Sequence, residues 1–414
     1  MHISVISCSG RELVALDADP SWRLHDVLAA LPEHSPAPDY KMRIFLGTVE
    51  LCGNLTLAGI GAENGRDLTL VLTPMPRVVS GCADGSVKIW SSASGECLHT
   101  LTGHKYWVWS AVFSPCGKKV LTASDDGTVK IWSVVLWECL RTLQVQRRVG
   151  SAAFSPDGQK VLTISCDGIG QVWSAATGEC LCTLESQVRS CTFSPDGQQV
   201  LACSGSSAVK LWHTTSGKHH WTLEGHRDEV LSAVFSRDGG DLLTASGDGT
   251  ARIWSTASRE CLRTFQGHQD GVRSAVFSPD ELEVLTASHD LTAKIWSVAS
   301  GACLHTLRGH RSGLRSAAFS PDGQHVITAS GDGAARVWSS TSGQCLRTLQ
   351  GHKYGARSAS FSPSGQEVLT VSGDGTAKVW AVASGECLGT MEAGVVSGGK
   401  AYQGLRKHSS TRGM

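Results

Sequence analysis

The chain has 414 residues, enough for two or three domains with buried cores. Its 37 basic and 37 acidic residues cancel to a formal net charge of zero, which argues against specific nucleic-acid binding and against binding to an anionic membrane. No run approaches the roughly 20 apolar residues that a membrane-spanning helix needs. The 46 glycines and 13 tryptophans indicate many short strands joined by tight turns.

Residues 1–74 do not follow the repeat that dominates the rest of the chain, and we predict that they form a domain of their own. Apolar alternation and turn residues predict two strands, a helix capped by Ser21, and two further strands. These elements are expected at residues 2–7, 12–17, 24–31, 43–46 and 68–72.

The order of these elements, with Ile44-Phe45-Leu46-Gly47 and Leu68-Thr69-Leu70-Val71-Leu72, resembles ubiquitin over the whole of residues 1–74. The resemblance implies an α+β ubiquitin-like (β-grasp) domain. This domain ends in Thr73-Pro74-Met75-Pro76 rather than in a Gly-Gly tail, so conjugation to substrates is not implied. Two interpretations stay open: Ile44 and Val71 contribute to an apolar recognition face like that of ubiquitin, or Ile44 belongs to the core, because the strand register around Arg43 is not fixed by the sequence.

A regular period organises the chain from residue 75 onward. Within one unit, residues 309–350, four strand-like runs alternate with turns such as Ser320-Pro321-Asp322-Gly323. Four antiparallel strands in each period of about 40 to 45 residues are typical of a propeller blade, and neighbouring blades must stack to bury their faces. Eight tryptophans mark the period at intervals of 39 to 42 residues: Trp90, Trp132, Trp173, Trp212, Trp254, Trp296, Trp338 and Trp380.

Gly-His before the first strand of five units, and Trp after the third strand, resemble WD repeats over about residues 75–394. The second letter of the repeat's name is missing, because Ser, His or Ala follows the Trp. The resemblance implies an all-β propeller, which we place at residues 75–399. Eight units predict eight blades, with seven as the alternative. Residues 77–101 supply only three strands of the first blade, so residues 394–400 are expected to return and complete it. Residues 400–414 are predicted to form a disordered tail.

The 15 cysteines do not form a disulfide framework, because equivalent positions in successive blades should lie farther apart than a disulfide allows. No Cys-x-x-Cys spacing indicates a zinc site, and we predict neither a metal nor a cofactor. Seven cysteines follow a repeating Trp by seven residues and are expected on a buried strand face in a reducing compartment: Cys97, Cys139, Cys180, Cys261, Cys303, Cys345 and Cys387.

His104, Ser124 and Asp126 have the residue types of a nucleophilic triad, but the same set recurs in five units, which argues against a single active site. The WD resemblance implies instead a structural tetrad of Asp, His, Ser and Trp, hydrogen-bonded inside each blade. We therefore predict a protein that is not an enzyme. The expected tetrads are His104, Ser124, Asp126 and Trp132; His226, Ser246, Asp248 and Trp254; His268, Ser288, Asp290 and Trp296; His310, Ser330, Asp332 and Trp338; and His352, Ser372, Asp374 and Trp380.

Two units depart from this pattern. The unit ending at Trp212 has Ser206 in place of the Asp and lacks Gly-His, so we expect no buried polar group to be left unsatisfied there. The unit ending at Trp173 lacks Gly-His but keeps Asp167, which is expected to be solvated or paired elsewhere. These two blades are predicted to be the least stable of the ring.

Binding by WD-repeat proteins typically uses the narrow face, through residues that flank the start of each first strand and the residue before the turn Asp. Carried over by position, the resemblance places Cys166, Gln187, Glu229 and Leu231 on this face. The residues that we expect to contact a partner are Trp107, Trp109, Asp125, Arg148, Arg189, Arg273, His289, Arg315 and Arg357.

These residues predict a non-catalytic interaction scaffold whose narrow face binds an acidic or phosphorylated peptide, with Arg as bidentate donor and Trp as anchor. The arginines could instead be a duplicated element, solvated or paired to acids on the rim. Trp107 and Trp109 are expected to contact a partner, or else to pack against the amino-terminal domain. The alternative function is a ubiquitin-pathway adaptor, whose amino-terminal domain docks on a receptor while the propeller selects clients. We expect a cytoplasmic protein, with the nucleus as the alternative location.

Overall fold

The chain divides into two compact units, Met1–Pro76 and Arg77–Met414. The computed structural model describes residues 2–7, 12–23, 26–27, 40–46, 49–51, 55–62, 67–74, 77–92, 94–184, 188–392 and 402–403.

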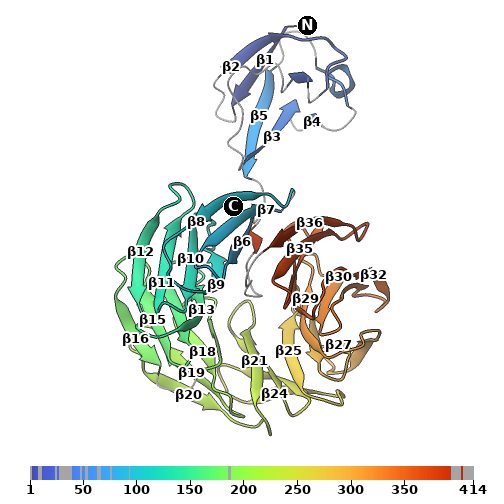
Figure 1. Cartoon of the computed structure of the whole chain (residues 1–414). Helices are drawn as coiled ribbons and strands as arrows, with labels where there is room; N and C mark the ends of the chain where they lie inside the picture. The colour runs from blue at the N-terminus through green and yellow to red at the C-terminus, as the bar shows by residue number, and fades with distance from the viewer. Residues whose placement is uncertain are drawn as a thin grey trace, which may run out of the picture. The chain divides into compact units, whose positions relative to one another are not determined.

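The first unit contains a five-stranded mixed sheet of order β2-β1-β5-β3-β4 (Figure 1). β1 and β5 are parallel, whereas the other neighbouring pairs are antiparallel. The elements are β1 His2–Ser7, β2 Glu12–Asp17, β3 Tyr40–Leu46, β4 Val49–Leu51, the 3₁₀ turn η1 Ala58–Ile60 and β5 Asp67–Pro74.

Ile44 belongs to the core of this unit. Its side chain is fully buried together with Ile3, Val5 and Leu68, which decides between the two interpretations of this residue. The strand register pairs Val71 with Arg43, whereas the side chain of Val71 lies outside what the structure describes.

The predicted helix at 24–31 lies largely outside the described residues. Asp26 and Val27 are helical, and the backbone N–H of Arg23 donates to the Asp26 carboxylate at 2.8 Å. Ser21, the predicted cap, instead donates its hydroxyl to Asp19 at 2.6 Å.

The second unit consists of eight four-stranded antiparallel sheets, which are the blades of a propeller (Figure 1). Blades 1 and 2 contain β37 Tyr402–Gln403, β6 Arg77–Gly81, β7 Val87–Ser91 and β8 Cys97–Leu101, then β9 Val108–Phe113, β10 Lys119–Ser124, β11 Thr128–Ser133 and β12 Cys139–Gln144. Blades 3 and 4 contain β13 Val149–Phe154, β14 Lys160–Ser165, β15 Gly170–Ser174 and β16 Cys180–Leu184, then β17 Ser190–Phe193, β18 Gln199–Cys203, β19 Val209–His213 and β20 His219–Leu223.

Blades 5 and 6 contain β21 Val230–Phe235, β22 Asp241–Ser246, β23 Thr250–Ser255 and β24 Cys261–Gln266, then β25 Val272–Phe277, β26 Glu283–Ser288, β27 Ala293–Ser297 and β28 Cys303–Leu307. Blades 7 and 8 contain β29 Leu314–Phe319, β30 His325–Ser330, β31 Ala335–Ser339 and β32 Cys345–Leu349, then β33 Ala356–Phe361, β34 Glu367–Ser372, β35 Thr376–Ala381 and β36 Cys387–Glu392.

The turn between the first and second strands shows how the repeated residues shape each blade. In blade 7, the Asp322 carboxylate accepts hydrogen bonds from the Ser320 hydroxyl and from the backbone N–H of Gln324, at 2.5 and 3.0 Å. Gly323 has a φ of 74°, a left-handed conformation that favours glycine. The turn chemistry read from the sequence is therefore the chemistry that reverses the chain here.

Apolar clusters join every blade to the next one around the ring. Each cluster combines the inner strands of one blade with the repeating tryptophan of its neighbour. The eighth cluster joins Val78 and Trp90 of blade 1 to Leu369, Val371 and Met391 of blade 8. Sheets that cannot bury both faces alone thus form a closed ring of eight blades rather than seven.

The strand that completes blade 1 lies slightly later in the chain than predicted. Tyr402 pairs with Val78 and Gln403 with Arg77, whereas the sequence pointed to residues 394–400. The predicted tail, residues 400–414, therefore includes a strand, because β6 would otherwise present an unpaired edge to its neighbour.

The seven repeating cysteines are exposed, contrary to the prediction that they lie on a buried face. They begin the fourth strand of every blade except blade 4, where His219 does. This strand is outermost in its sheet and buries mainly the residue four positions after the cysteine, such as Leu143 or Leu349. The thirteen cysteines in the described part of the chain are all free.

Candidate functional site

The repeated polar residues form a hydrogen-bonded chain through each of five blades, and blade 6 shows the geometry. Trp296 Nε1 donates to Thr286 Oγ1 at 2.8 Å, and Thr286 Oγ1 lies 2.7 Å from His268 Nε2. His268 Nδ1 lies 2.7 Å from the carboxylate of Asp290, which also accepts from the Thr292 hydroxyl. The chain links the loop before the first strand to the loop after the second.

Proton positions in this chain follow from the donors available. The indole can only donate, so the threonine hydroxyl accepts from it. The hydroxyl proton can go to the carbonyl of Lys294 at 3.3 Å or to His268 Nε2 at 2.7 Å, and we assign it to the shorter contact. The ring is then neutral and donates from Nδ1 to Asp290. Burial lowers the pKa of His268 against the opposing hydrogen bond and charge of Asp290, which keeps the ring neutral.

Asp290 stays charged for a complementary reason. Burial alone would raise the pKa of its carboxyl. Hydrogen bonds from Thr292, from the backbone N–H of Gln269 and from His268 outweigh burial and lower this pKa to about 2.

The third member of each chain is a threonine and not the predicted serine. Ser288 donates instead to the backbone carbonyls of Asp270 and Gly271, both at 3.0 Å, and accepts from the N–H of Asp290. Residues two apart on a strand share a face, so the sequence pattern alone did not separate Thr from Ser. The bridging residues are Thr122, Thr244, Thr286, Thr328 and Thr370.

Blade 4 contains a buried donor that the sequence did not anticipate. Ala202 occupies the threonine position, and the buried Nε1 of Trp212 has no hydrogen-bond partner among the described residues. The expectation that this blade leaves no buried polar group unsatisfied was wrong, because it considered the missing Asp and His but not the indole.

Blade 3 retains part of the chain. Trp173 Nε1 donates to Thr163 at 3.0 Å. Asp167, which lacks a histidine, forms an ion pair with Arg147 and accepts from the Ser165 hydroxyl. This pairing agrees with the expectation for Asp167.

The narrow face is the rim at which each first strand begins and each second strand ends. On blade 2, Trp107 is 45% exposed and packs against half-buried Trp109, with ring centroids 5.3 Å apart. Trp109 Nε1 donates to Asp125 at 2.6 Å. Arg148 of blade 3 binds the same carboxylate through Nε and Nη2, at 3.0 and 2.6 Å. The hydrogen bond from Arg148 lowers the pKa of Asp125, with a smaller effect from Trp109. Blades 2 and 3 are thereby joined across this rim.

A second ion pair crosses the rim between Arg189 of blade 4 and Glu229 of blade 5. His289 is exposed, and its ring would contact a side chain introduced at Gly313 of the next blade. Arg148 and Arg189 are therefore paired to rim acids, as the alternative interpretation of the arginines proposed.

The remaining three arginines differ from these two. Arg273, Arg315 and Arg357 are exposed and occupy the second position of β25, β29 and β33. They form no ion pair or hydrogen bond with the described part of the chain. They are spaced 42 residues apart, so the ring places them at equivalent positions on three consecutive blades.

Two exposed tyrosines on this face were not singled out from the sequence. Tyr106 and Tyr354 are 62% and 68% exposed, and each follows a lysine after the Gly-His pair of blades 2 and 8. The sequence does contain a signal for these tyrosines, because the other units with Gly-His have Asp or Ser at this position.

Within the described ranges, no group of three or more His, Cys, Asp or Glu side chains is arranged to hold a metal ion. No helix in those ranges has the length and apolar character to span a membrane.

Comparison with known proteins identifies the repeat. The family described as WD domain, G-beta repeat matches residues 69–91, 95–133, 137–174, 178–213, 217–255, 259–297, 301–339 and 343–381, more than half of the chain. The chain belongs to the WD-repeat family.

Other WD-repeat proteins match over short stretches. A nuclear distribution protein PAC1 of Mycosarcoma maydis is 51% identical over 45 residues, 11% of this chain and 10% of that protein. A Lissencephaly-1 homolog of Heterostelium pallidum is 44% identical over 45 residues, 11% of each chain. The nuclear distribution protein nudF 2 of Penicillium rubens is 31% identical over 120 residues, 28% of this chain and 25% of that protein. The chain thus spans at most a quarter of the length of these three relatives.

Among solved structures, the computationally designed Ika8 protein superposes with a TM-score of 0.65 and 30% sequence identity. The match covers 74% of this WD-repeat chain and 93% of the designed one.

Proposed function

We propose that this protein is a non-catalytic interaction scaffold whose narrow face binds an acidic or phosphorylated peptide. The observation that supports this most is the arrangement of Arg273, Arg315 and Arg357 on three consecutive blades, exposed and without an acid from the described chain. A guanidinium presents donors in a planar fork that matches a carboxylate or a phosphate, so three of them favour a ligand with several negative groups.

The aromatic pair on blade 2 supplies an anchor for the same ligand. Trp109 is held by Asp125, and Asp125 is held by Arg148, so the ring on which Trp107 packs is fixed before a partner arrives. An exposed, preorganised Trp loses little conformational entropy on binding, which is a common property of interface hot spots.

The repetition of the buried polar groups supports a role without catalysis. The buried His and Asp residues recur in five blades, and each is fully used in its own hydrogen-bonded chain. The thirteen free cysteines of the described ranges fit a reducing, cytoplasmic location. The relatives named nuclear distribution proteins favour a partner in the same cellular process.

Charge reversal of the three free arginines tests the proposal. The natural protein should bind peptides on an array of acidic and phosphorylated sequences. The variant R273E/R315E/R357E should no longer bind most of these peptides. The matched control is R189Q/E229Q, which removes an arginine of the same face together with the acid that already neutralises it. The proposal fails if the triple variant retains the same peptides, or if the control loses as many.

We propose a ubiquitin-pathway adaptor as the second candidate. The observation in its favour is the sheet order β2-β1-β5-β3-β4 with parallel β1 and β5, which fits the ubiquitin-like interpretation of residues 1–74. Burial of Ile44 means that a receptor would have to recognise other residues. Affinity purification with and without residues 1–74 tests this candidate: loss of ubiquitin-pathway proteins on truncation supports it, and an unchanged set argues against it.

A further inference from the structure

Trp221 occupies a position at which other blades have an arginine that forms hydrogen bonds to the next blade. In three blades, the third residue of the fourth strand is an arginine whose guanidinium donates to backbone carbonyls in a turn of the next blade, 35 or 36 residues later in the chain. The pairs are Arg141 with Ala176, Arg263 with Val298 and Ala299, and Arg347 with Ala383, at 2.6 to 3.3 Å.

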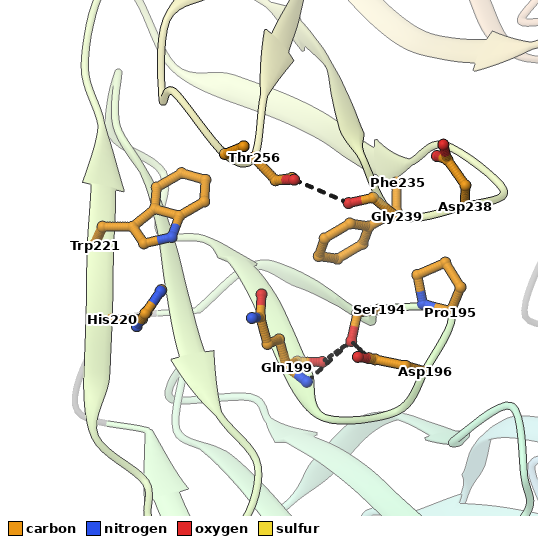
Figure 2. A pocket seen from close by; sticks show the side chains of 11 residues that line it. Ser194, Pro195, Asp196, Gln199, His220, Trp221, Phe235, Asp238, Gly239 and Thr256 are labelled. Carbon is orange, nitrogen blue, oxygen red and sulfur yellow. Dashed lines mark hydrogen bonds between the residues drawn. The ribbon is translucent and has the colours of Figure 1, made fainter.

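Blade 4 has Trp221 at this position, and the corresponding turn of blade 5 contains Thr256 and Ala257. Instead of a bound guanidinium, a cavity of about 200 Å³ lies between the two blades, lined by both turn residues and by Trp221 (Figure 2). The cavity opens at the rim opposite the narrow face, because the turns that line it follow the first and third strands. It is therefore independent of the proposed peptide site.

The walls of the cavity combine aromatic rings with unused polar groups. Trp221 is only 5% exposed, and its indole nitrogen, on the side of the cavity in Figure 2, donates no hydrogen bond to the described chain. The ring of Phe235 forms another wall, and the amide of Gln199 lies between the two rings. The indole nitrogen is not among the fully buried atoms without a partner, so it is open to the cavity, where a ligand can accept from it.

Two carboxylates supply negative charge at the mouth of the cavity. Asp196 and Asp238 each use Oδ1 to accept from a serine hydroxyl and from a backbone N–H of their own turn. The Oδ2 atom of each is free of described protein partners. Burial would raise the pKa of Asp196, but the hydrogen bonds of its turn outweigh it and lower this pKa. The Ser236 hydroxyl is the main cause that lowers the pKa of Asp238. Both groups are therefore ionised at neutral pH.

The positively charged groups nearby do not fill the cavity. Burial and the neighbouring His213 and Arg259 lower the pKa of His220, so its ring is neutral at pH 7. Arg259 lies 5.9 Å from the centroid of the Trp221 ring, yet it is not among the residues that line the cavity. The position of Arg259 shows that the face of this indole attracts a guanidinium.

We propose that the cavity between blades 4 and 5 binds the guanidinium of an arginine side chain from a partner peptide. The incoming group occupies the place that Arg141, Arg263 and Arg347 fill in other blades, donating to the carbonyls at Thr256 and Ala257 and to the free oxygens of Asp196 and Asp238. Trp221 donates from Nε1 to a peptide carbonyl of the same ligand. Sites for drug-sized molecules measure about 300 to 1,000 Å³. A cavity of about 200 Å³ therefore suits a single side chain.

Titration with N-acetyl-L-arginine methylamide tests the proposal on the full-length protein. The probe is added while the indole N–H resonances of the 13 tryptophans are followed, with the Trp221 signal assigned from its loss in Trp221→Phe. We expect saturable movement of the Trp221 signal, with a Kd on the order of millimolar for so small a contact. The citrulline analogue, which has the same shape without the charge, should shift the signal at least tenfold more weakly.

Two variants decide whether the cavity is responsible. Trp221→Arg introduces the residue that blades 2, 5 and 7 have at this position, so it should keep the fold, fill the cavity and abolish probe binding. Isothermal titration calorimetry measures probe binding to this variant. Asp238→Asn keeps the turn's hydrogen-bond acceptor and should weaken binding at least fivefold. Binding that persists in Trp221→Arg, equal binding of the citrulline analogue, or no saturable shift of Trp221 would each overturn the proposal.

Discussion

Ala202 leaves Trp212 of blade 4 with a buried Nε1 that has no partner among the described residues. In blade 3 the equivalent position is a threonine, which accepts the hydrogen bond of the indole N–H. We expect Ala202→Thr to stabilise the propeller by about 1 kcal/mol, the usual net contribution of one internal hydrogen bond. Blade 3 indicates that the pair suffices, because Thr163 and Trp173 form it without a histidine. Urea denaturation followed by tryptophan fluorescence measures the change.

Thr163→Ala is the matched control, since it creates in blade 3 the defect that blade 4 already has. It should lower the stability by about 1 to 3 kcal/mol. If Ala202→Thr is destabilising while Thr163→Ala behaves as expected, the site in blade 4 is too tightly packed for the hydroxyl.

Blades 3 and 4 should open more readily than the rest of the ring. Blade 4 lacks the whole polar chain that links its two loops, and Asp167 of blade 3 is tied to exposed Arg147 rather than to a buried histidine. We expect faster hydrogen exchange of amides in β14, β15, β18 and β19 than of those in β26, β27, β30 and β31. Equal protection in all blades would show that the polar chains do not determine local stability.

Thr244 and Ser246 distinguish the two candidates for the third member of the polar chain. Thr244→Ala removes the partner of both His226 Nε2 and Trp254 Nε1, so it should cost about 2 kcal/mol or more. Ser246→Ala removes a bond to the carbonyl of Asp228 and one from the backbone N–H of Asp248, and should cost less, about 1 kcal/mol. Denaturation curves of the two variants give the ranking, and a larger loss for Ser246→Ala would contradict the observed geometry.

The blades could be predicted from the sequence because their period and turn residues are local. The strands Leu314–Phe319 and His325–Ser330 lie where alternation and the Ser-Pro-Asp-Gly turn place them. The polar chain could be predicted only in part, since Thr and Ser two residues apart point to the same face of a strand and spacing does not show which one reaches the histidine.

Contacts between blades limited the prediction of the binding residues. Arg148 and Arg189 are neutralised because Asp125 and Glu229 happen to occur in the adjoining blades. Arg273 and its two equivalents have no such neighbour among the residues that the structure describes. Which arginine meets an acid depends on side chains that are far apart in the sequence, and a repeat pattern does not contain this information.

The cysteines should divide into reactive and protected groups. Cys345 and Cys387 are exposed on outermost strands, whereas burial raises the pKa of Cys203 to about 12 and also raises that of Cys191. Because the thiolate is the reactive form, alkylation of the native protein should label the first two residues and spare the other two until denaturant is added. Mass spectrometry of the alkylated peptides measures this, and labelling of Cys203 in the native state would show that blade 4 opens on the same timescale.

Acidification should destabilise the propeller before its carboxylates are protonated. The folded protein holds His268 neutral with a lowered pKa, while the unfolded chain takes up a proton below about pH 6.5. Protonation therefore favours the unfolded state, and stability falls as the pH decreases below 6.5. The carboxyl of Asp290 has its pKa lowered to about 2 in the folded state, so its contribution is lost between about pH 4 and pH 2.

The loss near pH 6 should be steep because five blades contain such a histidine: His104, His226, His268, His310 and His352. Thermal unfolding between pH 7.5 and pH 5 measures the slope. His268→Gln removes one of the five groups, so it should lower stability at pH 7.5 and flatten the pH dependence by about one fifth. An unchanged slope would mean that His268 has the same pKa in the folded and the unfolded protein. A steeper slope would mean that its ring is already protonated in the folded protein, with Thr286 accepting from Nε2 and donating to the carbonyl of Lys294.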